Sequence, residues 1–388
     1  MPNPPEPFAR DLKAAFDDLK SQALWRVRER RSSATAPRVQ VAGEALLTFS
    51  SNDYLGLASD PRVIAAFCEA AHRYGVGAGA SHLLGGHTEA HHALEEALAA
   101  FVGTPRALVF STGYMANLAL LTTFGARHRT LFEDRRNHAS LLDAAALSRA
   151  DRVRYRDPDD LRAHLDRAQP GGLIASDGVF SMDGDIADIP GLLACAQAHD
   201  LGLVIDDAHG FGVVGPKGRG SVAYHGLEPA SCLIQMGTLG KAFGVFGAFV
   251  AGSEALIEAL IQKARPYLYT TALPPAIASA AAASLAIAAR EDERRAALTA
   301  RITEFRAGAE ALGLRLTRSH SAIQAVLIGG AEAALAASRR LRSRGLLVTA
   351  IRPPTVPKGS SRLRIALSAA HTADDVQRLL AALPEAVS

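Results

Sequence analysis

A lysine in a glycine-rich, nearly uncharged stretch is the first candidate for covalent chemistry. Lys241 lies in the run Thr238-Leu-Gly-Lys-Ala-Phe-Gly244. A lysine with few polar neighbours is poorly hydrated, which lowers its pKa toward a neutral, nucleophilic amine. Asp206 ends an apolar run earlier in the chain, and a buried strand ending there would place it where ligands bind in open α/β sheets. The competing interpretations are an exposed loop lysine and an aspartate that caps the next turn.

Small residues between an apolar run and a helical segment predict an anion site. The segment 111–114 follows the apolar run 107–110, so its backbone N–H groups are free to bind a phosphate. An ordinary N-cap by Ser111 or Thr112 is the alternative. His138 also follows an apolar run. Together with the histidine at 209, an anion cradle, an acid and a poorly hydrated lysine at one sheet edge favour a phosphorylated aldehyde cofactor.

Other candidate motifs fail on their spacing. The glycine run 75–82 lacks the third glycine of a dinucleotide-binding loop, and Gly240-Lys241 lacks the Ser or Thr of a phosphate loop. The histidines in His87-Thr-Glu-Ala-His91-His92 lack the H-E-x-x-H order of zinc enzymes. This pattern favours the polar face of a helix, and we expect no metal.

The elements that position these residues follow from short, continuous apolar runs that alternate with helical segments. Such runs predict strands buried on both faces, and hence an α/β fold with a mostly parallel, doubly covered sheet. The expected strands are 107–110, 172–176, 203–206, 233–236 and 248–251. The expected helices between strands include 89–102 and 190–199.

Both ends of the chain depart from this alternation. Apolar positions at helical spacing predict an amphipathic helix over 8–31, and a small hairpin is expected over 39–49. The carboxyl end predicts a smaller α+β domain, with a helix over 291–312 and strands at 324–328, 346–351 and 362–367. The resulting division has three parts: an amino-terminal segment 1–48, a large domain 49–290 and a small domain 291–388.

Composition limits the classes of protein that the chain can represent. Of 388 residues, 48% are hydrophobic and the formal net charge is +3, which argues against a disordered chain and against nucleic-acid binding by bulk charge. The three cysteines, Cys68, Cys195 and Cys232, form no CxxC pair, so no disulfide framework is expected. Residues 1–10 lack the apolar core of a secretory signal, and no apolar run reaches membrane-spanning length. We expect a cytoplasmic protein.

The candidate residues occur within a series of ordered segments that resembles the α-oxoamine synthases, pyridoxal-phosphate enzymes of the aspartate-aminotransferase fold. The segments are Phe49-Ser-Ser-Asn-Asp-Tyr-Leu-Gly-Leu57, Ser111-Thr-Gly-Tyr-Met-Ala-Asn117, Phe180-Ser-Met-Asp-Gly-Asp185, Asp206-Asp-Ala-His-Gly210, Gly218-Arg-Gly220, Thr238-Leu-Gly-Lys241 and Ile351-Arg-Pro-Pro-Thr-Val-Pro357. The resemblance extends from about residue 19 to the carboxyl end. It implies a large domain with a mostly parallel seven-stranded sheet and a smaller carboxyl-terminal α+β domain.

The resemblance implies pyridoxal 5'-phosphate as cofactor and gives the candidates roles. Lys241 would form a Schiff base with the cofactor aldehyde and later move protons at the substrate α-carbon. Asp206 would pair with the pyridine nitrogen and keep it protonated. His138 would stack on the ring, His209 would hydrogen-bond its phenolic oxygen, and Ser181 would contact the same side of the cofactor.

Further contacts are implied around the phosphate end of the cofactor. Gly113 and Tyr114 would surround it, and Thr238 would add a hydroxyl near the lysine. Thr270 and Thr271 are candidates to reach the phosphate in a neighbouring subunit, because sites in this family lie at the interface of a homodimer.

For the substrates, the resemblance implies that Arg364 binds the carboxylate of an amino acid, a planar group that suits bidentate pairing. Arg362 is the nearest alternative, and a strand charge on the surface is the competing interpretation. Thr355 matches a position near the acyl substrate, and Arg26 one proposed to meet the far end of a pimeloyl chain. The alternatives to Arg26 are Arg28 and Arg30.

Within the family, the segments 206–210, 352–357 and 362–367 are most similar to members that join L-alanine to a pimeloyl thioester, with loss of CO2, in biotin biosynthesis. The thiol carrier is either coenzyme A or a carrier protein. Rival interpretations are another α-oxoamine synthase that uses glycine or serine, a plain aminotransferase of the same fold, and a non-catalytic binding protein. No nucleic-acid or membrane partner is expected.

Overall fold

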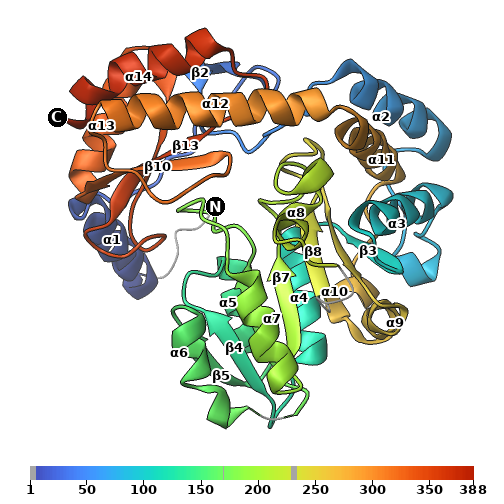
Figure 1. Cartoon of the computed structure of the whole chain (residues 1–388). Coiled ribbons are helices and arrows are strands. Elements are labelled where there is room, and N and C mark those ends of the chain that lie inside the picture. Colours follow the sequence, from blue (N-terminus) through green and yellow to red (C-terminus); the bar gives the residue numbers. More distant parts are fainter. Residues whose placement is uncertain (1–5, 169, 229–233) are drawn as a thin grey trace.

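A seven-stranded sheet forms the centre of the larger part of the molecule (Figure 1). The computed structural model describes residues 6–168, 170–228 and 234–388. The sheet has the order β3-β9-β8-β7-β6-β4-β5, in which only β9 runs antiparallel to its neighbours. Its strands are β3 (Arg106–Phe110), β4 (Thr130–Asp134), β5 (Asp151–Tyr155), β6 (Leu173–Asp177), β7 (Gly202–Asp206), β8 (Ile234–Thr238) and β9 (Ala248–Gly252). The prediction of a mostly parallel sheet is confirmed, and Leu233 of the strand expected at 233–236 lies outside the described residues.

Helices cover both faces of this sheet, which explains why its strands are apolar without alternation. Leu173 and Ala175 of β6 belong to one apolar cluster, and Ile174 between them belongs to another. The first face packs on α4 (Gly113–Phe124), α5 (Ala139–Leu147), α9 (Glu254–Lys263) and α10 (Arg265–Leu268). The second packs on α6 (Pro158–Arg162), α7 (Ile189–Ala198) and α8 (Gly220–Tyr224) at one end, and on α2 (Pro61–Tyr74), α3 (Glu89–Val102) and α11 (Pro275–Arg290) at the other.

The smaller carboxyl-terminal domain is built on antiparallel strands (Figure 1). Its sheet has the order β10-β13-β12. The elements are α12 (Asp292–Ala311), β10 (Ile323–Gly329), α13 (Ala331–Ser343), β12 (Thr349–Ile351), β13 (Ser361–Ala366) and α14 (Ala373–Val387). The predicted strand 346–351 is divided in two, because β11 (Leu346–Leu347) leaves this sheet and pairs elsewhere.

The amino-terminal hairpin is joined to this domain through β11. Strands β1 (Arg38–Val41) and β2 (Glu44–Thr48) form the predicted hairpin, and β2 pairs in parallel with β11. The division of the chain at residues 48 and 290 stays a prediction. The pairing nevertheless shows that the first segment completes a three-stranded sheet only with residues from the far end of the chain.

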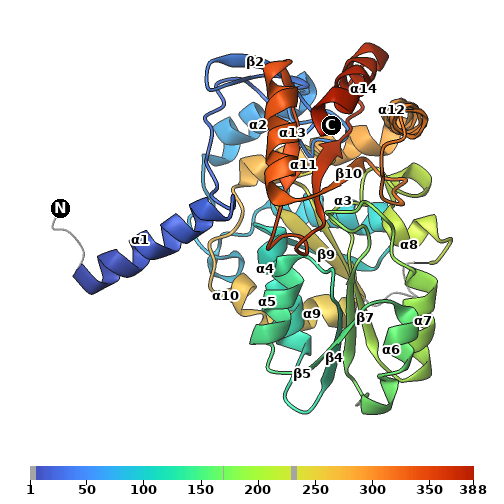
Figure 2. The ribbon, with the colours of Figure 1, turned by 90° about the vertical axis from the view of Figure 1, so that its left-hand side faces the viewer.

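The helix predicted over 8–31 is wrong in length. Helix α1 (Glu6–Ser21) ends ten residues earlier, and it projects from the body of the molecule (Figure 2). Ala23 takes a left-handed φ of 57°, and the N–H of Leu24 bonds back to the carbonyl of Leu19 at 2.8 Å. This closure satisfies a terminal carbonyl and stops the helix, which the apolar spacing alone does not reveal.

Two further sequence-based expectations concern side chains outside the sheet. The histidines at 87–92 do not share a polar helix face, because His91 is fully buried and His87 precedes α3. Cys68 and Cys195 are free, and Cys232 lies outside the described residues. Within the described residues, no helix combines the length and apolarity needed to cross a bilayer.

Candidate active site

A cavity of about 180 Å³ lies at the carboxyl edge of the parallel strands. Strands β6, β7 and β8 run in the same direction, so the residues that end them meet at one edge, where open α/β sheets bind ligands. We call it the sheet-edge cavity. Seven of the sequence-predicted residues line it: Gly113, Tyr114, His138, Asp206, His209, Thr238 and Lys241.

The amine of Lys241 is positioned by a short chain of hydrogen bonds. Its Nζ lies 2.9 Å from Nε2 of His209, whose Nδ1 lies 2.7 Å from the hydroxyl of Tyr54. The Tyr54 hydroxyl in turn donates to Oδ1 of Asn52 at 3.1 Å. If this hydroxyl donates to Asn52, it accepts from His209, so Nε2 of His209 is left as an acceptor for the amine.

Burial controls the protonation of this pair. It lowers the pKa of Lys241 to about 8, against the opposing effect of Asp206 and Asp177. The pKa of His209 falls well below its usual range because the ring is buried, and Lys241 and Arg364 push it the same way. A neutral His209 beside a readily deprotonated amine is therefore the state expected near pH 8.

The carboxylate of Asp206 is held at both oxygens. Oδ2 accepts from Nδ2 of Asn117 at 2.7 Å, and Oδ1 accepts from the backbone N–H of Ala208 at 3.0 Å. Asn117 is fully buried on α4, and the same Nδ2 reaches the hydroxyl of Ser140 at 2.8 Å. These bonds fix the carboxylate in one orientation at the end of β7.

The next acid along the chain, Asp207, points away from the sheet-edge cavity. It is fully buried, and its Oδ2 accepts from the N–H of Ser221. Burial raises its pKa to about 7. A Cβ on Gly210 would approach Asp207 Oδ1 to 2.0 Å, so that glycine allows the turn to close around the carboxyl. Asp207 thus supports the loop, whereas Asp206 faces the cavity.

His138 caps helix α5 and keeps its ring at the cavity. Its Nδ1 accepts from the N–H of Ser140 at 3.2 Å and lies 2.8 Å from that residue's hydroxyl. Its backbone N–H donates to the carboxyl of Asp177, at the end of β6. Burial, with Asp206 in the same sense, raises the pKa of Asp177 well above its usual range. The imidazole is thereby oriented while it remains exposed.

The start of α4 also lines the cavity, through Gly113 and Tyr114. Thr112 is the N-cap, and its Oγ1 accepts from the N–H of Met115 at 3.2 Å. The first N–H groups of a helix have no intrahelical acceptor and carry partial positive charge, so Gly113 and Tyr114 present an anion-binding terminus. Thr238 also lines the cavity, and its hydroxyl donates to the carbonyl of Gly247 at 3.0 Å.

Arg364 reaches this region from the carboxyl-terminal domain. Its Nε donates to the carbonyl of Ser181 at 2.7 Å, and its Nη1 donates to Oδ1 of Asn52 at 3.2 Å. Arg362 on the same strand is instead committed to an ion pair with Asp183. The geometry therefore separates the two arginines: only Arg364 shares a partner with the hydrogen-bond chain of Lys241.

Several sequence-predicted residues lie outside the cavity lining. Ser181 contributes a carbonyl to Arg364 and is itself buried. Thr355 is exposed in the loop after β12 and does not line the cavity, so its predicted place near the acyl substrate stays a prediction. Arg26 is exposed beyond α1. Burial and the charge of Arg26 lower the pKa of Arg352, and the predicted contact of Arg26 with the acyl chain stays a prediction.

Thr270 and Thr271 adjoin a second part of the surface. Thr271 forms a β-bridge with Ser81, and Thr270 is half-buried. Neither lines the sheet-edge cavity of the same chain, so their predicted contact with a neighbouring subunit stays a prediction.

Sequence reasoning gave no role to Tyr54, Asn52, Asn117 or Asp177, although the structure places all four in the hydrogen-bond networks above. Tyr54, Asn52 and Asn117 lie within two of the segments that carry the family resemblance. That position was the available signal, since none of the four has a distinctive local pattern.

The chain is similar over almost its whole length to known proteins. The family model described as aminotransferase class I and II matches residues 44–383. A protein of Pseudomonas paraeruginosa named 8-amino-7-oxononanoate synthase is 55% identical over 377 residues, covering 97% of this chain and 94% of that one. Among solved structures, a serine palmitoyltransferase from S. paucimobilis is 33% identical with a TM-score of 0.91, covering 97% and 96% of the two chains. An 8-amino-7-oxononanoate synthase from Francisella tularensis is 34% identical with a TM-score of 0.77, covering 88% and 97%.

Proposed function

We propose a function from one premise: the chain belongs to the aminotransferase class I and II family. The protein is a pyridoxal-phosphate-dependent acyltransferase that condenses L-alanine with a pimeloyl thioester. The products are 8-amino-7-oxononanoate, CO2 and the free thiol carrier, a step of biotin biosynthesis. The names of the relatives support this assignment, and the serine palmitoyltransferase structure is described with bound PLP.

The donor set of the sheet-edge cavity fits this cofactor. An amine, a fixed carboxylate, an exposed imidazole and a helix N-terminus line one cavity, and they match an aldehyde, a pyridine nitrogen, an aromatic face and a phosphate. Lys241, Asp206, His138 and Gly113 would hold those four groups, and His209 would meet the phenolic oxygen. When bound, pyridoxal 5'-phosphate supplies an aldehyde that bonds to amines and a ring that withdraws electrons from the adjacent carbon.

Lys241 and His209 prepare the attack on a carbonyl and the transfer of a proton. Lys241 has a pKa near 8, so a large fraction of its amines are neutral at mildly basic pH and able to attack a carbonyl or accept a proton. His209, kept neutral by burial, accepts a hydrogen bond from that amine at 2.9 Å. The amine is thus held toward the cavity in readiness for proton transfer.

Charge in the cavity is organised by Asp206 and Arg364. The two bonds from Asn117 and Ala208 present the Asp206 carboxylate without reorganisation, which is how a fixed charge contributes most to catalysis. Arg364 has bonds to Ser181 and Asn52 that direct its guanidinium, and it would bind the amino-acid carboxylate. Positioning of that carboxylate decides which bond of the substrate is broken.

The observation that carries the proposal is the 2.9 Å contact between Lys241 Nζ and His209 Nε2 in a cavity that Asp206 also lines. The test is L-alanine-dependent release of thiol from pimeloyl-CoA by the cofactor-loaded protein, with the mass of the product measured. Release with glycine or serine in place of alanine would reassign the chain to another α-oxoamine synthase. Amino-group transfer without release of CO2 or thiol would indicate a plain aminotransferase.

We also propose that the enzyme is a homodimer. Leu83, Leu84 and Tyr269 are 52%, 80% and 72% exposed, and the bridge between Ser81 and Thr271 brings their segments together. Exposed apolar side chains that gather in this way are typical of an interface. Helix α1 also projects from the body with Phe16 42% exposed (Figure 2). Light scattering coupled to size exclusion tests this, and a monomeric mass would contradict it. The cytoplasmic location stays a prediction.

A further inference from the structure

A group of histidines around the start of α3 forms a second concentration of titratable side chains. His82, His87, His91 and His92 lie together with Glu95, and we call them the α3 histidine cluster. His82, His87, His92 and Glu95 line a cavity of about 530 Å³ that shares no lining residue with the sheet-edge cavity. The proposed reaction uses none of these residues.

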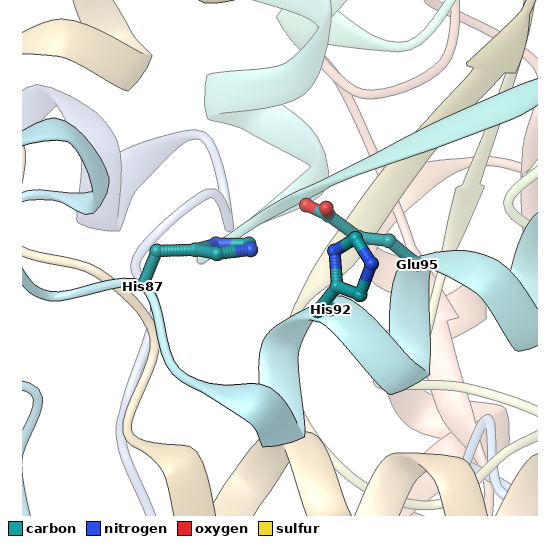
Figure 3. A group of neighbouring side chains, drawn as sticks. All are labelled: His87, His92 and Glu95. Carbon is teal, nitrogen blue, oxygen red and sulfur yellow. The ribbon is translucent and has the colours of Figure 1, made fainter.

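Three members of the cluster point their donor atoms toward one another (Figure 3). His92 and Glu95 are three positions apart on α3, so they share a helix face. His87 precedes the helix, and the chain folds its ring toward the same point. The ligand atoms of His87, His92 and Glu95 all lie within 4.8 Å of one another. Two imidazoles and a carboxylate are the His2Glu donor set that zinc accepts in open, three-ligand sites.

The cluster also supplies the outer support that metal-binding histidines require. Nδ1 of His87 lies 3.0 Å from Nδ1 of His82. His82 is buried and stacked on Tyr267, with ring centroids 4.7 Å apart. A neutral His82 that accepts from Nδ1 of His87 leaves Nε2 of His87 with a free lone pair. A bond of this kind fixes the tautomer and the ring orientation of a ligating histidine.

The carboxylate of Glu95 lacks a cationic partner. One oxygen accepts from the N–H of Val109 at 2.9 Å, and no lysine or arginine of the described residues forms an ion pair with it. Arg106 instead forms its ion pair with Glu258. The contact of His92 with Glu96 is long, at 3.4 Å, between two exposed side chains, and such pairs contribute little. His92 can therefore leave Glu96 at small cost.

We propose that His87, His92 and Glu95 form a binding site for one divalent transition-metal ion, with zinc as the preferred ion. The ion would supply the counter-charge that the half-buried Glu95 lacks and would tie the segment before α3 to the helix. Three protein ligands leave a fourth position for water on the side of the 530 Å³ cavity. The sequence order around residues 87–92 did not indicate this site, because one ligand lies outside the helix that carries the others.

The proposal is tested by titrating zinc sulfate into the untagged, full-length, cofactor-loaded protein by calorimetry. The variants are His92→Ala, His87→Ala and Glu95→Gln, and His199→Ala serves as the control because it removes an exposed histidine elsewhere. Each variant retains the cofactor, so zinc bound by the cofactor itself appears equally in all of them. Glu95→Gln also alters the group that accepts from the N–H of Val109, so the exposed His92→Ala variant decides the case.

We expect one zinc ion per chain, with affinity at least about tenfold weaker in His92→Ala and His87→Ala than in the parent protein. The control is expected to bind within about twofold of the parent. Cobalt(II) in the same site is expected to give visible absorption bands of a four-coordinate ion, which the His92→Ala variant loses. Zinc binding that is equal in parent, His92→Ala and His87→Ala, or absent from the parent, overturns the proposal.

Discussion

The sheet-edge cavity and the α3 histidine cluster contain the same kinds of side chain and differ in how their charges are balanced. Each places imidazoles beside a carboxylate, which is buried for Asp206 and half-buried for Glu95. In the cavity, Asp206 accepts two hydrogen bonds and acts electrostatically on the nearby amine of Lys241. In the cluster, Glu95 accepts one backbone hydrogen bond and has no ion pair among the described residues.

This difference indicates what each region is prepared to bind. A carboxylate already fixed by its own chain can stabilise charge on a ligand without moving. A carboxylate that no cation of its own chain neutralises is stabilised by a cation that binds beside it. The sheet-edge cavity is therefore arranged for an organic ligand that becomes positively charged where it is bound. The α3 histidine cluster is arranged for a metal ion. Variants in the two regions are expected to separate these roles, and their effects should decline in the following order.

The largest effect is expected from Lys241→Ala. Removing the amine eliminates both the covalent attachment and the proton carrier, so turnover should fall by about 10³-fold or more. Thiol release from pimeloyl-CoA measures the loss. Thermal unfolding provides the control, because a half-buried amine adds little to stability and the melting temperature should change by only a few degrees. Turnover near that of the parent would remove Lys241 from the mechanism.

A smaller loss is expected from Asp206→Asn, which keeps the size of the side chain and removes its charge. Turnover should fall by about 10²-fold or more, because the fixed negative charge acts on the cofactor ring in the transition state. Asp207→Asn is the matched control, since its carboxyl contacts Ser221 and faces away from the cavity. If both variants lose turnover equally, Asp206 has only a structural role.

The pKa of Lys241 predicts a pH dependence for cofactor capture. Burial lowers this pKa to about 8, so the amine is protonated below pH 8 and becomes neutral as the pH rises through that value. The rate at which the cofactor-free protein binds pyridoxal 5'-phosphate covalently should rise by about tenfold per unit up to pH 8 and then level off. Absorbance of the bound cofactor follows the rate. A midpoint near the ordinary lysine value would contradict the effect of burial.

A moderate effect is expected from Asn117→Ala, which removes one of the two donors to Asp206. A hydrogen bond to a carboxylate contributes about 1 kcal/mol or more, so turnover should fall by about fivefold. A structural role alone would change only stability. The distinguishing readout is the pH titration of the bound cofactor's absorbance, which should shift if Asn117 positions Asp206 and should not shift otherwise.

The smallest effect on turnover is expected from His92→Ala in the α3 histidine cluster. The side chain is exposed and lines a cavity separate from the sheet-edge cavity, so thiol release should stay within about twofold of the parent. This result would show that the two regions act separately, because a substitution in the α3 histidine cluster would leave the reaction in the sheet-edge cavity unchanged. A loss comparable to that of Asp206→Asn would show that the two regions are coupled.

Much of the sheet could be predicted from the sequence because its strands are buried on both faces. Every strand expected between residues 107 and 251 has a counterpart, and each carboxyl end that carries a candidate lies at the common edge. The strand ends alone therefore predict that Lys241, Asp206 and His209 lie close together, and all three line one cavity. The packing of the helices is not needed for this prediction. The roles of these three residues stay predictions until the variants are measured.

The parts that could not be predicted depend on contacts between distant segments. Arg364 and Asn52 are 312 residues apart in the chain and meet only when the carboxyl-terminal domain packs on the large one. Asn117 reaches Asp206 across 89 residues through a buried helix face. Arg26 was assigned by counting along the chain, and α1 ends at Ser21, before this residue, so its role in binding the acyl chain stays a prediction.

The pairing of β2 with β11 can form only late in the synthesis of the chain. Residue 50, just after β2, bonds to a residue 297 positions later, so the ribosome must make most of the protein before that edge of the hairpin finds its neighbour. Until then an apolar strand remains open to pairing with other nascent chains. A messenger that stops before codon 346 would yield a product with this edge permanently unprotected, and chaperones would be needed to keep it from aggregating.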